Sequence, residues 1–208
     1  MPDLQSLILA APAILFGLTI HEFSHGYVAW RLGDPTAKMM GRLTLNPLKH
    51  LDPIGTVALF LFRFGWAKPV PIDPTYFRHP TRDMAISSLA GPGANLLTAA
   101  VAGAIVRAFD LLGISGFPWM LAVYFVIFNI ILCFFNLIPI PPLDGSRLVY
   151  HLLPRNLASQ YARLERYGFI LLIGIIFVGQ MAGVSLFSVY LGPILRILGV
   201  LLTGHNLA

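Results

Sequence analysis

Charged residues are scarce in this chain. Asp, Glu, Lys and Arg make up only 11% of its 208 residues, and 57% are hydrophobic, whereas soluble domains carry roughly 25% charged residues. This composition excludes an ordinary soluble globular protein and predicts an integral membrane protein. Because apolar segments recur from end to end without a polar globular insert, we predict one domain over residues 1–208.

Cysteine is nearly absent as well. The single Cys133 excludes an intramolecular disulfide and a thiolate metal cluster. Its place in an apolar run predicts a core or lipid-facing residue. The first residues lack the positively charged region of a secretory signal, so we expect the first apolar stretch to be retained.

The net charge of +5 comes from basic residues in the connections between apolar stretches. Eight Lys and Arg residues lie at 31–82 and four at 147–166, but none lies at 110–118. Basic residues are enriched in the loops that stay in the cytoplasm. We therefore expect both basic connections to face the cytoplasm, and the charge does not indicate nucleic-acid binding.

The apolar segments predict an all-α polytopic membrane protein. Residues 7–30, 84–109 and 119–140 are each long enough to cross a hydrocarbon core, which needs about 20 helical residues. The tail at 169–202 fits either two spans or one span plus an interfacial helix. The Pro- and Gly-rich segment at 31–83 contains only a short apolar patch, which favours short strands or a re-entrant element.

Residues 21 to 25 read His-Glu-Phe-Ser-His, an H-E-x-x-H sequence inside the first apolar stretch. On a helix, His21 and His25 share one face and can bridge one zinc ion, while Glu22 can deprotonate the zinc-bound water. Ionisable groups at the centre of a span cost about 2.5–3.5 kcal/mol each. Three of them in five residues therefore predict a bound metal rather than a chance pattern.

A catalytic zinc usually has three protein ligands, so a third is needed. Asp144 follows a proline-rich stretch at the end of the third span. His25 lies six residues before Arg31 and Asp144 three before Arg147, which puts both within about 5–9 Å of the same membrane boundary at 1.5 Å per residue. Asp144 is therefore the candidate. Four other histidines are expected to be solvated surface residues: His50, His79, His151 and His205.

Four stretches in this order resemble the site-2 protease family of intramembrane zinc metalloproteases, in the compact prokaryotic form without a PDZ domain. They are HEFSHG at 21–26, GRLTLNPLKHLDPIG at 41–55, AGPGAN at 90–95 and NLIPIPPLDG at 136–145. The resemblance implies a three-helix catalytic core within residues 1–146 and additional C-terminal helices within 167–203. It also implies a small membrane-associated β element after the first helix.

The resemblance further implies one zinc ion per chain with Asp144 as its third ligand. It suggests that Asn136, and also Asn95, polarises the scissile carbonyl or orients the substrate. The alternatives are a helix-end cap or interhelical hydrogen bond for Asn136 and helix packing for Asn95. The segment from Gly41 to Pro71 would hold an unwound transmembrane substrate by strand addition, or else cap the surface without touching substrate.

The expected protein is thus an intramembrane zinc metalloendopeptidase that hydrolyses peptide bonds in or near transmembrane segments of membrane-protein substrates. It would lie in the prokaryotic cell membrane, with its site near the cytoplasmic face. One rival is a non-catalytic relative, against which the intact Glu22 argues because a structural metal site needs no base. The other is a metal transporter, against which the clustering of the polar residues at one depth argues.

Overall fold

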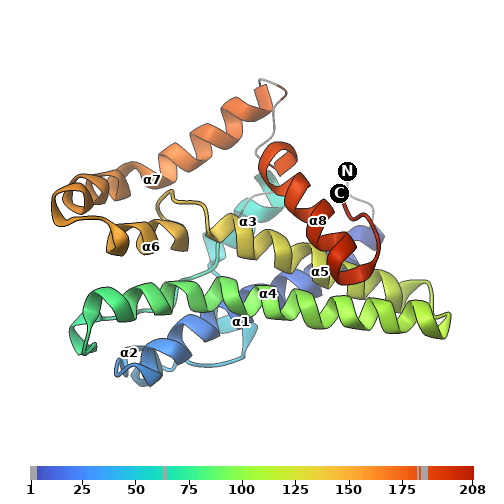
Figure 1. Cartoon of the computed structure of the whole chain (residues 1–208), viewed down its shortest axis with the longest axis horizontal. Helices are drawn as coiled ribbons and strands as arrows, with labels where there is room; N and C mark the ends of the chain where they lie inside the picture. Colours follow the sequence, from blue (N-terminus) through green and yellow to red (C-terminus); the bar gives the residue numbers. More distant parts are fainter. Residues whose placement is uncertain (1–3, 63–64, 182, 184–186) are drawn as a thin grey trace.

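The computed structural model describes residues 4–62, 65–181, 183 and 187–208. The chain is helical (Figure 1). Its α-helices are α1 (Leu4–Arg31), α2 (Thr36–Met39), α3 (Pro53–Phe62), α4 (Pro80–Leu112), α5 (Phe117–Asn136), α6 (Asp144–Leu152), α7 (Arg155–Met181) and α8 (Gly192–Thr203). Among the described residues, α1, α4 and α5 are long and apolar enough to cross a membrane, as the sequence predicted.

The three long helices form the core of the molecule. They pack on one another more extensively than any other elements (Figure 1). The α4–α5 contact is built from six buried residues: Ala99, Ala102, Val106, Val123, Val126 and Ile130. Small residues let the helix axes approach closely, which is how helices associate in lipid, where burial of apolar surface gives little driving force.

The direction of each helix follows from pairs of residues far apart in sequence. Near the start of α1, Gln5 approaches Met120 near the start of α5. Further along α1, His25 contacts Ser87 near the start of α4. α1 and α5 therefore run in the same direction and α4 runs in the opposite one, so the end of α1, the start of α4 and the end of α5 lie at one end of the bundle.

Large apolar side chains are exposed on the outer faces of several helices. Leu97 on α4 is 67% exposed and Phe177 on α7 is 62% exposed. Such surfaces are unfavourable in water and suit contact with lipid chains. Together with the three long apolar helices, they describe an integral membrane protein.

The segment that precedes the C-terminal tail is helical. The basic connection at 147–166 forms most of α6 and the first turns of α7. Leu172 on α7 packs against Ile138 and Leu143, which fixes α7 beside the segment that follows α5. The tail continues as a π-helical stretch, η3 (Phe187–Leu191), and the short apolar helix α8, which packs on α4 and α5.

The prediction of a small β element between α1 and α4 is wrong for the residues that the structure describes. The described residues there form α2, the 3-10 turns η1 (Pro47–Lys49) and η2 (Pro74–Tyr76), and α3, and their only β pairing is an isolated bridge between Leu51 and Ala67. Prolines recur through this segment and cannot donate ladder hydrogen bonds. Asp52 accepts a hydrogen bond from Gly55 N–H and so caps α3, which makes the short apolar patch helical.

Candidate metal centre

Two imidazoles meet on one face of α1. His21 and His25 are one helical turn apart, both are buried, and their Nε2 atoms lie 3.0 Å from each other. The helix is apolar before and after them, so its geometry alone brings the two rings together. The i and i+4 spacing thus places two nitrogen ligands at one point inside the bundle.

Asp144 reaches the same point from another element. Its Oδ2 lies 3.0 Å from the Nε2 of His21 and 3.0 Å from the Nε2 of His25. The prolines after α5 end that helix and turn the chain back, so that Asp144 becomes the first residue of α6. At Gly145 an added Cβ would collide with the carbonyl of Leu137, so this turn requires glycine next to the aspartate.

The hydrogen bonds behind the two rings decide which nitrogens carry protons. His21 Nδ1 lies 2.6 Å from Asn95 Oδ1, and His25 Nδ1 lies 2.6 Å from the carbonyl oxygen of Ser87. Both partners accept hydrogen bonds, so each neutral ring carries its proton on Nδ1 and presents a lone pair on Nε2. Two lone pairs and a carboxylate oxygen then point at one another, which is unfavourable without a cation between them.

This donor set fits zinc. Zinc takes imidazole nitrogen and carboxylate oxygen at about 2.0–2.2 Å in tetrahedral geometry, which separates neighbouring ligand atoms by about 3.3 Å. The three ligand atoms of His21, His25 and Asp144 lie within 4.8 Å of one another. Three protein ligands leave one position open, as in catalytic rather than structural zinc sites.

α4 passes directly over the two rings. A Cβ at Gly91 would lie 2.7 Å from His21 Nε2 and still closer to His25 Nε2. Only glycine leaves room for the imidazoles and a metal at this position. The A-G-P-G-A-N stretch thus contributes space at Gly91 and a hydrogen-bond acceptor at Asn95.

Glu22 lies beside the centre and is held by the segment that follows α3. Its Oε2 accepts a hydrogen bond from Val70 N–H at 2.8 Å. This segment is anchored further on, where Asp73 N–H donates to the buried carboxylate of Asp34 at 2.8 Å. The extended chain around Val70 is therefore fixed against α1 next to the predicted base.

A cavity of about 500 Å³ opens onto these groups and is lined by His21, Glu22, His25, Asp144 and Asn136, among others. Asn136 also donates from Nδ2 to the Leu132 carbonyl at 2.9 Å, one turn earlier in α5. Asn95 is fully buried and does not line this cavity. Of the two predicted amides, the structure brings Asn136 to the cavity and places Asn95 behind His21.

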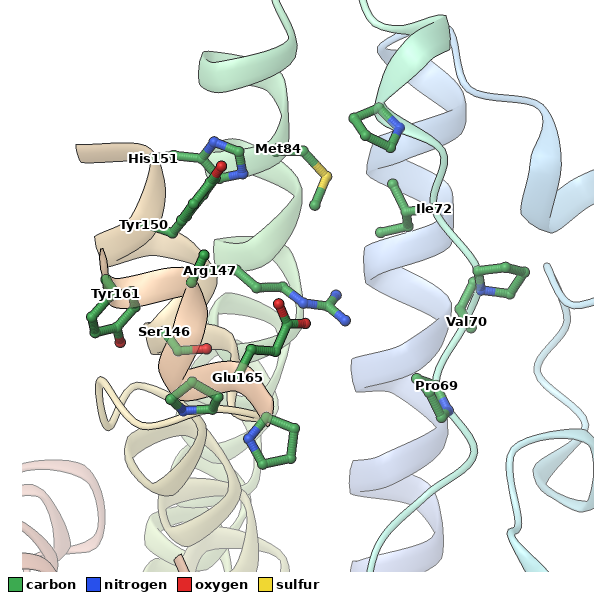
Figure 2. A pocket seen from close by; sticks show the side chains of 15 residues that line it. Pro69, Val70, Ile72, Met84, Ser146, Arg147, Tyr150, His151, Tyr161 and Glu165 are labelled. Carbon is green, nitrogen blue, oxygen red and sulfur yellow. The ribbon is translucent and has the colours of Figure 1, made fainter. Parts of the chain in front are cut away.

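The cavity continues into a groove of about 660 Å³, because Val70 and Arg147 line both. In Figure 2 the segment around Val70 and Ile72 forms one wall and α6 and α7 form the other, with Arg147 pointing into the space between them. Burial and the nearby Arg147 guanidinium lower the pKa of His151 in this groove. The lowered pKa favours the neutral form of His151, and the charged side chains of the groove are Arg147 and Glu165 (Figure 2).

The other predicted surface histidines differ in their environments. His79 and His205 are exposed and His151 is half-buried, but His50 is only 1% exposed. His50 is not a solvated residue, because its carbonyl accepts a hydrogen bond from Lys68 N–H, which brings the later segment across it. Its Nε2 pairs with the Thr44 carbonyl at 2.8 Å, which makes it a structural residue.

Sequence reasoning missed Asn129. It is fully buried in the middle of α5 and contacts Asn95 rather than the cavity. An amide inside an otherwise apolar span is expensive unless it is paired. That cost is the signal that would have identified Asn129 from the sequence.

An H-E-x-x-H helix that meets a carboxylate within a bundle of apolar helices defines a membrane-embedded metalloprotease. The chain belongs to peptidase family M50, the site-2 protease family. Residues 112–178 match the model of that family, which is described as Peptidase family M50. The chain is therefore a zinc metalloprotease, a hydrolase of peptide bonds.

Two bacterial relatives carry the name "Putative zinc metalloprotease". YwhC of Bacillus subtilis is 39% identical over 166 residues, which cover 77% of this chain and 76% of the relative. Rip2 of Mycolicibacterium smegmatis is 33% identical over 172 residues, which cover 80% of this chain and 65% of the relative. No solved structure matches the chain.

Proposed function

We propose that this protein is an intramembrane zinc metalloendopeptidase that hydrolyses peptide bonds in or near transmembrane segments of membrane-protein substrates. The observation that carries the proposal is the convergence of His21, His25 and Asp144 at one end of three apolar helices. These three residues would hold one zinc ion per chain. The shared cavity with Glu22 supports a catalytic rather than a structural centre.

Glu22 is the general base of the proposed reaction. Zinc bound at this centre would supply Lewis-acid activation of the attacking water and of the scissile carbonyl. Glu22 takes a proton from the water and passes it to the leaving amine. The hydrogen bond from Val70 N–H holds the carboxylate in one orientation for both transfers.

Asn136 is the proposed hydrogen-bond donor to the substrate carbonyl. Its amide nitrogen carries two protons, and the Leu132 carbonyl uses one of them. The other can stabilise the oxyanion that develops during attack. Asn95 lies behind His21, which favours a packing and orienting role over substrate contact.

The groove beyond the cavity is the proposed site for the polar flank of an extended substrate. A transmembrane helix keeps its peptide groups paired, so cleavage requires local unwinding and new partners for the released groups. The segment around Val70 forms one wall of both cavities, which supports its contact with the unwound strand. Arg147 and Glu165 both line the groove, so it offers a cation and a carboxylate to polar groups of the substrate beside the cleaved bond.

The protein is proposed to lie in the prokaryotic cell membrane with the site near the cytoplasmic face. The end of the bundle that holds the metal centre is also the end from which both basic connections emerge. Basic residues favour the cytoplasmic side. Its partners would be lipid and transmembrane protein substrates.

Replacing Glu22 with Gln tests the proposal. Purified Glu22→Gln protein in proteoliposomes should keep wild-type zinc content and lose cleavage of a transmembrane substrate by at least about 100-fold, the effect typical of removing a general base. Asp110→Asn makes the same change at the far end of α4 and should leave cleavage intact. A Glu22→Gln protein that still cleaves, or a wild-type protein that binds no zinc, would refute the proposal.

A further inference from the structure

Two buried amides connect α4 and α5 behind the metal centre. Asn95 and Asn129 are both fully buried, and Asn95 Nδ2 lies 2.9 Å from Asn129 Oδ1. Neither lines the cavity that contains the predicted ligands. Two amides in an apolar bundle require an explanation, because unpaired polar groups there are costly.

Main-chain carbonyls fix the direction of every hydrogen bond in this pair. Asn129 Nδ2 donates to the Phe125 carbonyl at 2.9 Å, so Oδ1 faces Asn95 and accepts. Asn95 Nδ2 donates both to Asn129 Oδ1 and to the Gly17 carbonyl at 3.0 Å. Asn95 Oδ1 is therefore turned toward His21 Nδ1 and accepts its proton at 2.6 Å.

Reversal of the Asn95 amide would change the state of His21. The reversed amide would present N–H to Nδ1 and force the proton of the imidazole onto Nε2, where it would block the lone pair needed for a metal. In the present arrangement reversal would also set Asn95 Oδ1 against two acceptors, the Gly17 carbonyl and Asn129 Oδ1. Asn129 supplies one of the two contacts that oppose reversal.

The packing around Asn129 is consistent with this role. A Cβ at Gly17 would lie 3.1 Å from Asn129 Oδ1 and 2.6 Å from Leu132 Cδ1. The glycine thus allows α5 to approach α1 closely enough for Asn129 to reach Asn95. Three helices meet at this point: α1 supplies Gly17 and His21, α4 supplies Asn95, and α5 supplies Asn129.

We propose that Asn129 is a positioning residue of the metal centre. It acts through Asn95 to hold His21 in the tautomer with the proton on Nδ1, which keeps the lone pair of Nε2 directed at the metal. The inference rests on the proposed function, in which His21 is a zinc ligand. Residues that orient metal-bound histidines typically change metal affinity by 10–100-fold when they are replaced.

The test compares zinc affinity in three purified variants with that of the wild type. Asn129→Leu keeps the branched shape of the side chain but removes the acceptor, and its zinc Kd in a chelator competition should rise by about 10-fold or more. Asn129→Asp, as the neutral acid, can donate to the Phe125 carbonyl and accept from Asn95, so its Kd should stay near wild type. Cys133→Ala removes another buried side chain one turn away in α5, and should also leave the Kd unchanged.

The tautomer of His21 provides a second measurement, which a simple packing defect would not change. In the zinc-free protein labelled with 15N-histidine, the His21 ring should carry its proton on Nδ1, and Asn129→Leu should shift it toward Nε2. If the Leu variant does not fold, Asn129→Ala removes the same acceptor without bulk and is measured in the same way.

Several results would overturn the inference. They are an unchanged Kd and tautomer in Asn129→Leu, a loss in Asn129→Asp as large as in the Leu variant, and a loss in Cys133→Ala of the same size. Each is distinguishable from failure of the proposed function, because that failure would appear as absence of zinc binding in the wild-type protein itself.

Discussion

Gly91 offers a sharp steric test of the metal centre. The helix α4 crosses the two imidazoles at this residue, and a Cβ there would lie 2.7 Å from both Nε2 and Cε1 of His21. Ordinary van der Waals contact begins near 3.4 Å. In a Gly91→Ala protein the ring must therefore retreat by about 0.7 Å, the difference between these distances, and His25 must move further.

A metal centre does not tolerate such a shift. Zinc–ligand distances hold within about ±0.2 Å, and the new methyl group also occupies space beside the nitrogens that face the metal. We expect zinc affinity to fall by at least about 100-fold, or about 2.7 kcal/mol, and cleavage to fall with it. Zinc Kd is measured by chelator competition on protein that remains monodisperse and helical.

Gly93 is the matched control, two residues further along the same helix. A Cβ there meets nothing within 4 Å, and the residue is exposed. Alanine in place of glycine in a helix stabilises it by up to about 1 kcal/mol, so Gly93→Ala should be neutral or stabilising with normal zinc affinity. A Gly91→Ala protein that binds zinc like the wild type would show that α4 does not pass over His21 and His25 as described.

Two further predictions concern the surroundings of the centre. Asp34→Asn replaces a fully buried carboxylate that accepts from Thr36 N–H and Asp73 N–H. It should lower the free energy of unfolding by about 1–3 kcal/mol in denaturation experiments, while the zinc affinity of the folded protein stays the same. An unchanged free energy of unfolding would refute the role of Asp34 in anchoring the segment around Val70. Zinc ligands must be deprotonated to bind the metal, so zinc affinity should fall in acid; an affinity that does not change with pH would show that His21 and His25 do not hold the metal.

Local patterns in the sequence predicted the three residues that the structure brings together, His21, His25 and Asp144, better than the residues that surround them. The H-E-x-x-H spacing brings its two histidines together within a single helix, and the depth of Asp144 follows from counting residues to the basic boundary. Both could therefore be predicted without knowledge of the tertiary structure. The partner of Asn129 could not be predicted, because it lies 34 residues away in sequence and depends on how α4 and α5 pack. The steric role of Gly91 likewise depends on where α4 crosses the two imidazoles of α1.

The connections were harder to predict than the spans. Basic residues between 147 and 166 indicated a connection on the cytoplasmic side but not its secondary structure, because charged side chains are compatible with a helix whose charged face lies outside the hydrocarbon. The segment before α4 suggested strands because its residues alternate weakly. Its prolines and the cap at Asp52 decided otherwise, and these are local signals that could have been weighed more heavily.

The three long helices are joined by two kinds of contact. Ala, Val and Ile side chains of α4 and α5 pack from the far end of the bundle as far as Ile130, the residue after Asn129. From the middle of the bundle toward the candidate metal centre, α1, α4 and α5 are also joined by hydrogen bonds from Asn95, Asn129 and the two histidines. Because apolar burial gives little association energy in lipid, these hydrogen bonds both join the helices and orient the imidazoles. The candidate metal centre is therefore part of the packing of the three helices, and changes to Asn95 or Asn129 should alter zinc affinity and helix association together.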